Sequence, residues 1–471
     1  MSGQVGDHGG VSHRPSERLR VPAPVLRTRV RSKRAATDQP NVTGDGASPL
    51  TARFWVLLVV TGIAAGLSGI ALMALLHAVS EWAWGSGAAE GLGAAVERAD
   101  AWGRIWPLLL AGLVAGVGGY LLRRFVPGRT DVDDAIWTGD ARLGVRRSSG
   151  TAVLSEVVVG LGASLGREAA PKLMGGVWGA VLAGWGGLSV EQRRLLVACG
   201  AGAGLACVYD VPLGGALFVA EVLVGTVRLP VVLPALACTA TATVVAWLYL
   251  PAGPVYPGLP DPVTTPSLLV WAVPAGVLIG VLATGWVRLI GFVSHHGPRR
   301  TWWRIAAPVV AFGLLGVAGL VFPQLYGNGA DLAEQAFLGG GALLLFAMLA
   351  VLKPLVTAMC LGSGASGGLF TPTLCTGALL GAALGGVWSA LWPGTPVGTF
   401  ALVGAAAMIG AGMQAPLAGL VLVLELTGTG FAIAVPLVVA TLVATAVARW
   451  LDGYSIYSAR LAAQPTAEQS T

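Results

Sequence analysis

The sequence predicts an all-α polytopic membrane protein whose two halves form an inverted-topology internal repeat with broken, tilted helices. The first observation behind this prediction is composition, because 11% of the 471 residues are charged and 55% are hydrophobic. A soluble globular protein has about 25% charged residues, so this chain has too few charges to cover a soluble surface. The other two observations are a series of apolar segments and a motif that occurs once in each half.

Five regions are expected. They are a disordered basic cytoplasmic tail (1–50), a first membrane repeat (51–250), an external linker (251–265), a second membrane repeat (266–464) and a short cytoplasmic tail (465–471). The segment 1–50 contains eight Lys/Arg and no apolar run, so it cannot bury enough surface to fold alone. We interpret it as a solvated tail retained inside by its charge, and attraction to anionic lipid is the less favoured alternative.

Seven apolar segments are long enough to cross a membrane. They lie near 54–79, 105–122, 231–250, 267–293, 305–323, 341–360 and 432–450. Shorter segments, broken by Gly and Pro, lie near 151–165, 172–185, 195–208, 212–227, 372–392, 399–412 and 416–429. These short segments cannot all span, because broken helices at membrane depth are tolerated only where protein buries them or a wet cavity adjoins them.

The distribution of Lys and Arg predicts the orientation. These residues gather in the N-terminal tail and in three later loops, whereas the loops 251–265 and 324–336 contain none. The basic loops are therefore expected to be cytoplasmic, with both termini inside, and the other two loops external. The segment 54–79 then starts inside and the segment 267–293 starts outside, so the two halves would be related upside down.

The two halves share a motif at an offset of 204 residues. Residues 210–222 read DVPLGGALFVAEV and residues 414–426 read QAPLAGLVLVLEL, and a second short match lies upstream of each. Two motifs in the same order predict a repeat, and the functional site is expected at the repeat interface. Glu221 and Glu425 occupy equivalent positions, for which we favour hydrogen bonding at a helix or repeat junction over ion or proton handling.

Glu168 is the first candidate functional residue. It lies between two short apolar segments, and a carboxylate at membrane depth is costly unless it faces a cavity or a partner. It stands at the start of the segment 169–185, where free N–H groups and the positive helix end accept an anion. A glutamate there can occupy an anion site itself and leave when protonated. The alternative is a capping carboxylate paired with Arg167.

The segment 364–372, GASGGLFTP, is the second candidate. Its glycines predict backbone that bends or is approached closely, and a helix starting just after it would expose N–H groups as an anion nest. The alternative is a tight re-entrant turn with packing glycines. Its Gly-Ala-Ser-Gly also resembles the nucleophile motif of intramembrane serine proteases, but every histidine lies upstream of Ser366, so we expect no enzyme.

Three further side chains are of interest. Lys172 and Lys353 could raise the potential of an anion path or snorkel to an interface. The phenol of Tyr457 offers one neutral donor, which suits a weakly bound anion, and the alternative is an interfacial tyrosine. The five cysteines are expected to be small buried hydrophobes. We find no metal-ligand spacing and no nucleotide motif, so we expect no metal, no cofactor and no nucleic acid.

These residues together resemble the CLC family of chloride channels and chloride/proton antiporters, of the prokaryotic type without CBS domains, over roughly 54–464. The segment GREAAP (166–171) is similar to the family's GREGP, which implies that Glu168 is the gating glutamate. The segments GSGASGGLFTP (362–372) and IYSARL (456–461) imply that the N–H groups of Leu369 and Phe370 and the hydroxyl of Tyr457 bind chloride. The family also implies a homodimer in membrane lipid, with one anion pathway per subunit.

The sequence departs from the family pattern in three places. Ala169 and Ala170 replace the Gly-Pro after the glutamate, and Ala169 is kept as a candidate anion-binding residue. The first half-site, GSGIP in the family, has its best match at 128–132, where Thr130 is the candidate substitute for the missing serine. Asp131, Asp133 and Asp134 follow and are expected to oppose anions near the inner mouth. Val222 stands where the antiporters carry an inner proton-transfer glutamate.

The predicted function is permeation of chloride or a similar anion, gated by Glu168. Val222 favours channel-like or uncoupled conduction, because loss of an acid removes an obvious proton relay. The alternative is a chloride/proton antiporter that uses water or another acid, with protons as a second partner. An alternative of another class is a transport-inactive membrane scaffold or sensor. The expected location is the bacterial cell membrane.

Overall fold

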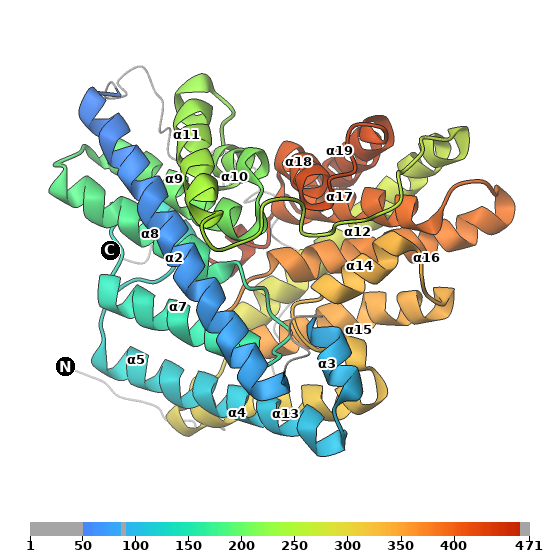
Figure 1. Ribbon diagram of the computed structural model, residues 1–471, viewed down its shortest axis with the longest axis horizontal. Helices are drawn as coiled ribbons and strands as arrows, with labels where there is room; N and C mark the ends of the chain where they lie inside the picture. Colours follow the sequence, from blue (N-terminus) through green and yellow to red (C-terminus); the bar gives the residue numbers. More distant parts are fainter. Residues whose placement is uncertain (1–49, 86–90, 462–471) are drawn as a thin grey trace, which may run out of the picture. The chain divides into compact units, whose positions relative to one another are not determined.

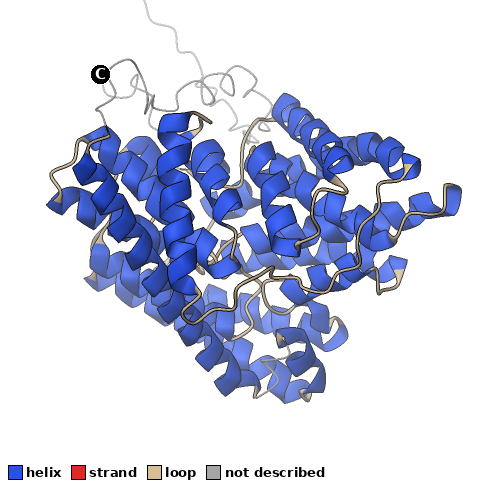
Figure 2. Ribbon diagram, turned by 45° about the horizontal axis from the view of Figure 1, so that its top comes forward, coloured by secondary structure: helices blue, strands red, loops and turns tan. Residues whose placement is uncertain are grey.

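The described part of the chain is built from helices and contains no strand (Figure 2). The computed structural model describes residues 50–85 and 91–461. The predicted tails 1–50 and 465–471 therefore lie, apart from Leu50, outside the described residues. Eight of the described helices are long and apolar enough to cross a membrane. The prediction of an all-α polytopic membrane protein is confirmed.

Seven of the eight are the long segments that the sequence predicts. They are α2 (Ala52–Trp84), the continuous α4 (Ala101–Leu113), η2 (Val114–Gly118) and α5 (Gly119–Phe125), then α11 (Leu229–Ala246), α12 (Pro266–His295), α13 (Thr301–Val321), α15 (Leu343–Gly362) and α19 (Ala434–Leu451). The eighth is α16 (Phe370–Leu391), which the sequence wrongly placed among the short segments. Its glycines do not break it: a Cβ on Gly381 would overlap the backbone of Phe400 in the neighbouring helix, so small residues there allow close helix packing.

The remaining helices lie outside these eight candidate spans. They are α3 (Leu92–Arg98), α6 (Val132–Thr138), α7 (Val145–Gly160), α8 (Ala169–Trp185), α9 (Val190–Tyr209), α10 (Pro212–Phe218) with the π-helical η3 (Val219–Val224), α14 (Ala330–Leu338), α17 (Val397–Met413), α18 (Pro416–Thr427) and the single turns η4 (Pro323–Leu325) and η5 (Ser458–Arg460). Helices α9 and α17 are buried along nearly their whole length. Protein on all sides allows such helices to end at membrane depth.

The two repeats use the same packing. Helix α8 packs on α9 as α16 packs on α17, and α2 packs on α11 as α12 packs on α19. Figure 1 shows α2, α8, α9 and α11 on one side and α12, α16, α17, α18 and α19 on the other. Asp210 and Gln414, which the sequence aligns, both end their helices in the left-handed backbone region, with φ of 54° and 57°. The internal repeat read from the sequence is therefore a repeat of structure.

Equivalent segments of the two repeats meet through reciprocal contacts. The carboxylate of Glu221 accepts a hydrogen bond from the N–H of Ala418 (2.7 Å) at the start of α18. The carboxylate of Glu425 accepts one from the N–H of Gly214 (2.6 Å) at the start of α10. The favoured junction role of both glutamates is confirmed. Reciprocal contacts between equivalent segments reflect a local twofold relation, and a twofold axis in the membrane plane turns one repeat upside down.

Lys353 lies inside the protein and does not snorkel. It is fully buried, and its Nζ donates to the carbonyl oxygens of Leu325 (2.8 Å) and Gly327 (2.7 Å). Its ammonium thereby holds the loop between α13 and α14 against α15. The five cysteines are all buried and free, as expected.

Replacing Glu425 with Ala should destabilise the protein, because backbone N–H groups at the start of α10 would lose their charged acceptor. The expected loss in the free energy of unfolding is about 1–3 kcal/mol, and Glu221→Ala should cause a loss of similar size at α18. Thermal unfolding in detergent measures both, with Glu97→Ala on the exposed side of α3 as the control. An unchanged Tm in both cap variants would contradict the capping role.

Candidate functional site

Glu168 lies in the loop that joins α7 to α8, at the interface between the two repeats. This loop pairs with the loop before α16, since Gly166 and Gly368 exchange two N–H···O=C hydrogen bonds of 2.8 Å each. A Cβ at either glycine would overlap the carboxylate of Glu168. The position of the carboxylate therefore requires glycine at both positions, and the pairing of the loops brings the two predicted motifs together.

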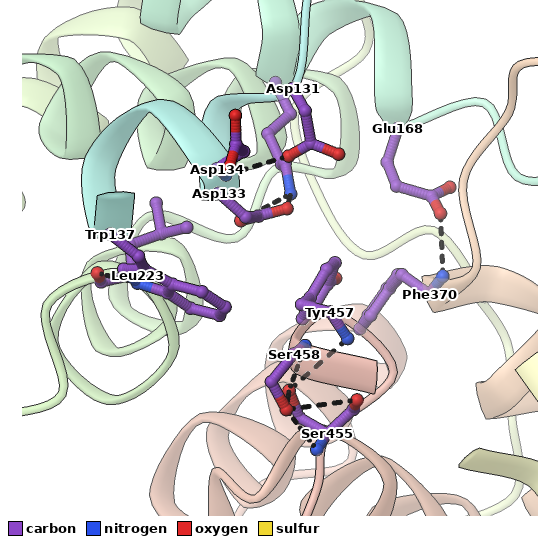
Figure 3. A network of polar contacts seen from close by, with 11 residues as sticks. Asp131, Asp133, Asp134, Trp137, Glu168, Leu223, Phe370, Ser455, Tyr457 and Ser458 are labelled. Carbon is purple, nitrogen blue, oxygen red and sulfur yellow. Dashed lines mark hydrogen bonds and ion pairs between the residues drawn. The ribbon is translucent and has the colours of Figure 1, made fainter. Parts of the chain in front are cut away.

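The carboxylate of Glu168 is buried and fully engaged, with the residue 3% exposed. Its Oε1 accepts a hydrogen bond from the N–H of Phe370 (2.7 Å), as Figure 3 shows. Its Oε2 accepts from the hydroxyls of Tyr209 (3.0 Å) and Thr371 (3.3 Å). The sequence placed this carboxylate at the start of α8, but it binds the start of α16 in the other repeat. The paired loops direct the side chain across the interface.

The start of α16 has the properties of an anion nest. Leu369 precedes the helix and Phe370 is its first residue, and they are 3% and 1% exposed. The N–H groups at a helix start have no intrahelical acceptor, and the positive end of the helix dipole favours negative charge. The carboxylate of Glu168 takes this place in the structure. Binding of a free anion by Leu369 and Phe370 stays a prediction.

Arg167 does not form the ion pair with Glu168 that the sequence analysis gave as the alternative. Among the described residues no such pair is present, and the guanidinium lies over the ring of Tyr209, 5.1 Å from its centroid. Tyr209, whose hydroxyl donates to Glu168, is a residue of the candidate site that the sequence analysis missed. Its equivalent in the second repeat is Met413, so the repeat gave no signal for it.

Tyr457 is buried, with 8% exposure, which excludes an interfacial position. Its N–H donates to the hydroxyl oxygen of Ser455 (3.3 Å), which also accepts from the N–H of Ser458 (3.0 Å). Its ring packs edge-on against Phe218, with centroids 5.7 Å apart. In Figure 3 it lies between Phe370 and the aspartates of α6. Its role in binding an anion stays a prediction.

Lys172 and Asp133 form an ion pair beside Tyr457. The Nζ of Lys172 lies 2.8 and 3.1 Å from the two carboxylate oxygens of Asp133. This excludes the snorkelling alternative for Lys172, and it corrects the expectation of unopposed negative charge for Asp133. Asp131 caps α6 by accepting from the N–H of Asp134 (3.0 Å). The sequence contained one signal that Lys172 belongs to the site: it follows Glu168 by four residues, a spacing that places both on one helix face.

The remaining predicted positions surround this cluster. Thr130 precedes the capping residue of α6, and Ala169 is the first residue of α8; both are partly exposed. Their anion-binding roles stay predictions. Val222 is 4% exposed, and the next residue, Leu223, accepts a hydrogen bond from the indole of Trp137 (2.8 Å). The described residues contain no group of His, Cys, Asp and Glu that could hold a metal ion.

Fold and site together define a class of protein: a polytopic helical protein with inverted repeats, which holds a carboxylate at a helix start where the repeats meet. A family model described as "Voltage gated chloride channel" matches residues 111–449. The chain therefore belongs to the voltage-gated chloride channel (CLC) family, and its class of function is CLC-type anion transport.

Curated relatives agree with this assignment. The chain is 32% identical over 417 residues to a putative chloride channel protein ClcB-like of Ralstonia nicotianae, covering 85% of this chain and 95% of that protein. It is 30% identical over 443 residues to an H(+)/Cl(-) exchange transporter ClcA of Salmonella arizonae, covering 88% and 90%.

Solved structures share the fold. A slow cyanobacterial Cl-/H+ antiporter superposes with a TM-score of 0.74 at 23% identity, covering 87% of this chain and 97% of that one. A CLC-type fluoride/proton antiporter superposes with a TM-score of 0.67 at 20% identity, covering 86% and 97%. The CLC-type arrangement of inverted repeats with broken helices is thus established for this chain.

Replacing Tyr209 with Phe should weaken the hold on the Glu168 carboxylate, because it removes one of three donors. Chloride competing for Phe370 should then bind up to about tenfold more tightly, since a hydrogen bond to a charged group contributes about 1.5 kcal/mol or more. Isothermal titration calorimetry with chloride measures the change. Tyr256→Phe, a buried tyrosine packed on Phe337, is the control. Equal chloride affinity in Tyr209→Phe and Tyr256→Phe would contradict the hydrogen bond assigned between Tyr209 and Glu168.

Proposed function

We propose that this protein lets chloride or a similar anion permeate the membrane along a path gated by Glu168, in a channel-like or uncoupled manner. The observation that carries the proposal is the hydrogen bond of 2.7 Å between the Glu168 carboxylate and the N–H of Phe370. An N–H group that donates to a carboxylate oxygen at a helix start can donate to a halide in the same place. The carboxylate is then a tethered competitor of the transported anion.

The chemistry of the site suits transport. The N–H of Phe370 and the hydroxyls of Tyr209 and Thr371 are neutral donors, and permeation requires binding that is weak enough for release. Protonation of Glu168 would remove its charge and favour its departure from the amide. An anion could then take its place and the path would open.

Val222 supports uncoupled conduction over proton coupling. It is an apolar, buried residue at the position that the family resemblance assigns to an inner proton-transfer glutamate. The neighbouring Leu223 is joined to α6 through Trp137, so this part of the first repeat packs through an indole and aliphatic groups. A side chain without a titratable group cannot take part in a proton relay.

Location and assembly belong to the same proposal. The distribution of Lys and Arg supports both termini in the cytoplasm of a bacterial cell. The family resemblance supports a homodimer with a separate path in each subunit.

Proton-coupled antiport is the second candidate function, and one residue favours it. Glu156 on α7 is fully buried, and neither of its carboxylate oxygens has a hydrogen-bond partner among the described residues. Its charged neighbours are Arg167 and Glu168. A buried carboxyl without partners is far less costly when neutral than when ionised, so Glu156 could store a proton near the gate. Three of the proteins reported above are also named or titled as proton exchangers or antiporters.

Liposomes loaded with chloride should release it without taking up protons, because the path lacks the inner acid. Glu168→Gln and Glu168→Ala should increase the release several-fold, since each removes the tethered charge. Chloride-electrode and pH-electrode recordings on the same vesicles provide the measurement. Absence of any anion flux in all three proteins would contradict transport and favour the scaffold or sensor alternative.

The variant Glu156→Gln separates the two transport candidates. Under uncoupled conduction it should leave the ratio of proton to chloride movement at zero, because no proton passes through it. If the unmodified protein instead drives protons uphill, and Glu156→Gln abolishes this while chloride still flows, antiport through Glu156 replaces our proposal. Thermal unfolding of the variant provides the control for folding.

A further inference from the structure

A buried ion pair lies one helical turn away from the gating glutamate. Lys172 follows Glu168 by four residues on α8, which places both on the same face about 6 Å apart along the axis. Its Nζ contacts both carboxylate oxygens of Asp133, at 2.8 and 3.1 Å. The two side chains are only 13% and 8% exposed. The pair therefore joins the first turns of α6 and α8.

Two aromatic rings complete the surroundings of the ammonium group. Its nitrogen lies 4.3 Å from the ring centroid of Tyr457 and 5.6 Å from that of Phe218. Aromatic faces attract a cation without neutralising it. An ammonium group has three N–H donors, and Asp133 accepts from two of them. The charge of Lys172 is thus balanced by one carboxylate, next to a tyrosine that the resemblance assigns to chloride.

Such a pair is a poor device for stability alone. The free energy needed to remove both charges from water is about as large as the free energy gained from their attraction. Apolar residues of similar size stabilise a fold equally well. An anion path has a different need, because a dehydrated anion requires a positive charge or several donors close by. Lys172 supplies that charge close to the segment in which this chain lacks the serine of the family pattern.

We propose that Lys172 is a second binding group for the transported anion and that Asp133 is its tethered competitor. An anion that reaches the ammonium displaces the Asp133 carboxylate, as an anion displaces Glu168 from Phe370. This inference rests on the proposed function and adds a binding residue to it. A hollow lined by Arg129 and by the ion pair of Arg142 and Asp140 adjoins both ends of α6.

The test compares Asp133→Asn with the double variant Asp133→Asn/Lys172→Met. Neither contains an unpaired buried carboxylate, and they differ only in the ammonium group. Chloride binding is measured by titration calorimetry in detergent, and Tm is measured in sodium chloride and in sodium gluconate at equal ionic strength. The single variant should bind chloride about tenfold more tightly than the unmodified protein, equivalent to about 1.4 kcal/mol, and its Tm should rise with chloride. The double variant should lose both effects.

The control is Asp452→Asn, which breaks a surface pair with Arg288 (2.7 Å) and should change neither measurement. Equal chloride affinity in the single and double variants would overturn the inference. If Glu168→Gln nevertheless binds and conducts chloride, the proposed function stands and only the role of Lys172 fails. If no variant, including Glu168→Gln, binds or conducts any anion, the proposed function itself fails.

Discussion

The hydrogen bond between the Glu168 carboxylate and the Phe370 N–H is the interaction on which the rest of the structure depends. It joins the two repeats at their shared interface, and it requires Gly166 and Gly368 because any Cβ there would overlap the carboxylate. Long-range packing of α8 on α9 and of α16 on α17 holds the two helix starts at this distance. The burial that excludes water from the carboxylate also strengthens each hydrogen bond to it.

The same physical device, a carboxylate at a helix start, serves two purposes in this protein. Glu221 and Glu425 cap α18 and α10 reciprocally, across the repeat interface but near its partly exposed edge. Glu168 caps α16 at the buried centre, beside the hydroxyl of Tyr209. Repeat symmetry accounts for the paired caps. The central site breaks that symmetry, because only one of the two motifs that meet there carries an acid.

Near the site, a basic and an acidic side chain form an ion pair. The aspartates in the first turn of α6 would repel anions if none of them were paired. The charge of Asp133, however, is balanced by Lys172. The aromatic rings of Tyr457 and Phe218 then enclose the ammonium group. Within this pair the two opposite charges balance each other, and the ammonium group is the positive charge that we propose for anion binding.

The sequence by itself determined seven spans, the internal repeat, the capping role of Glu221 and Glu425, and the two motifs that meet at the site. Hydropathy, glycine placement and motif spacing are local properties of the chain, so they can be read without the fold. The tertiary structure alone decided that α16 is a full-length helix, that Glu168 binds the start of α16 and not of α8, and that Tyr209 and the Asp133–Lys172 pair belong to the site. These contacts join residues far apart in the chain, and backbone N–H groups are chemically alike at every helix start, so only the packed path of the chain selects the partner.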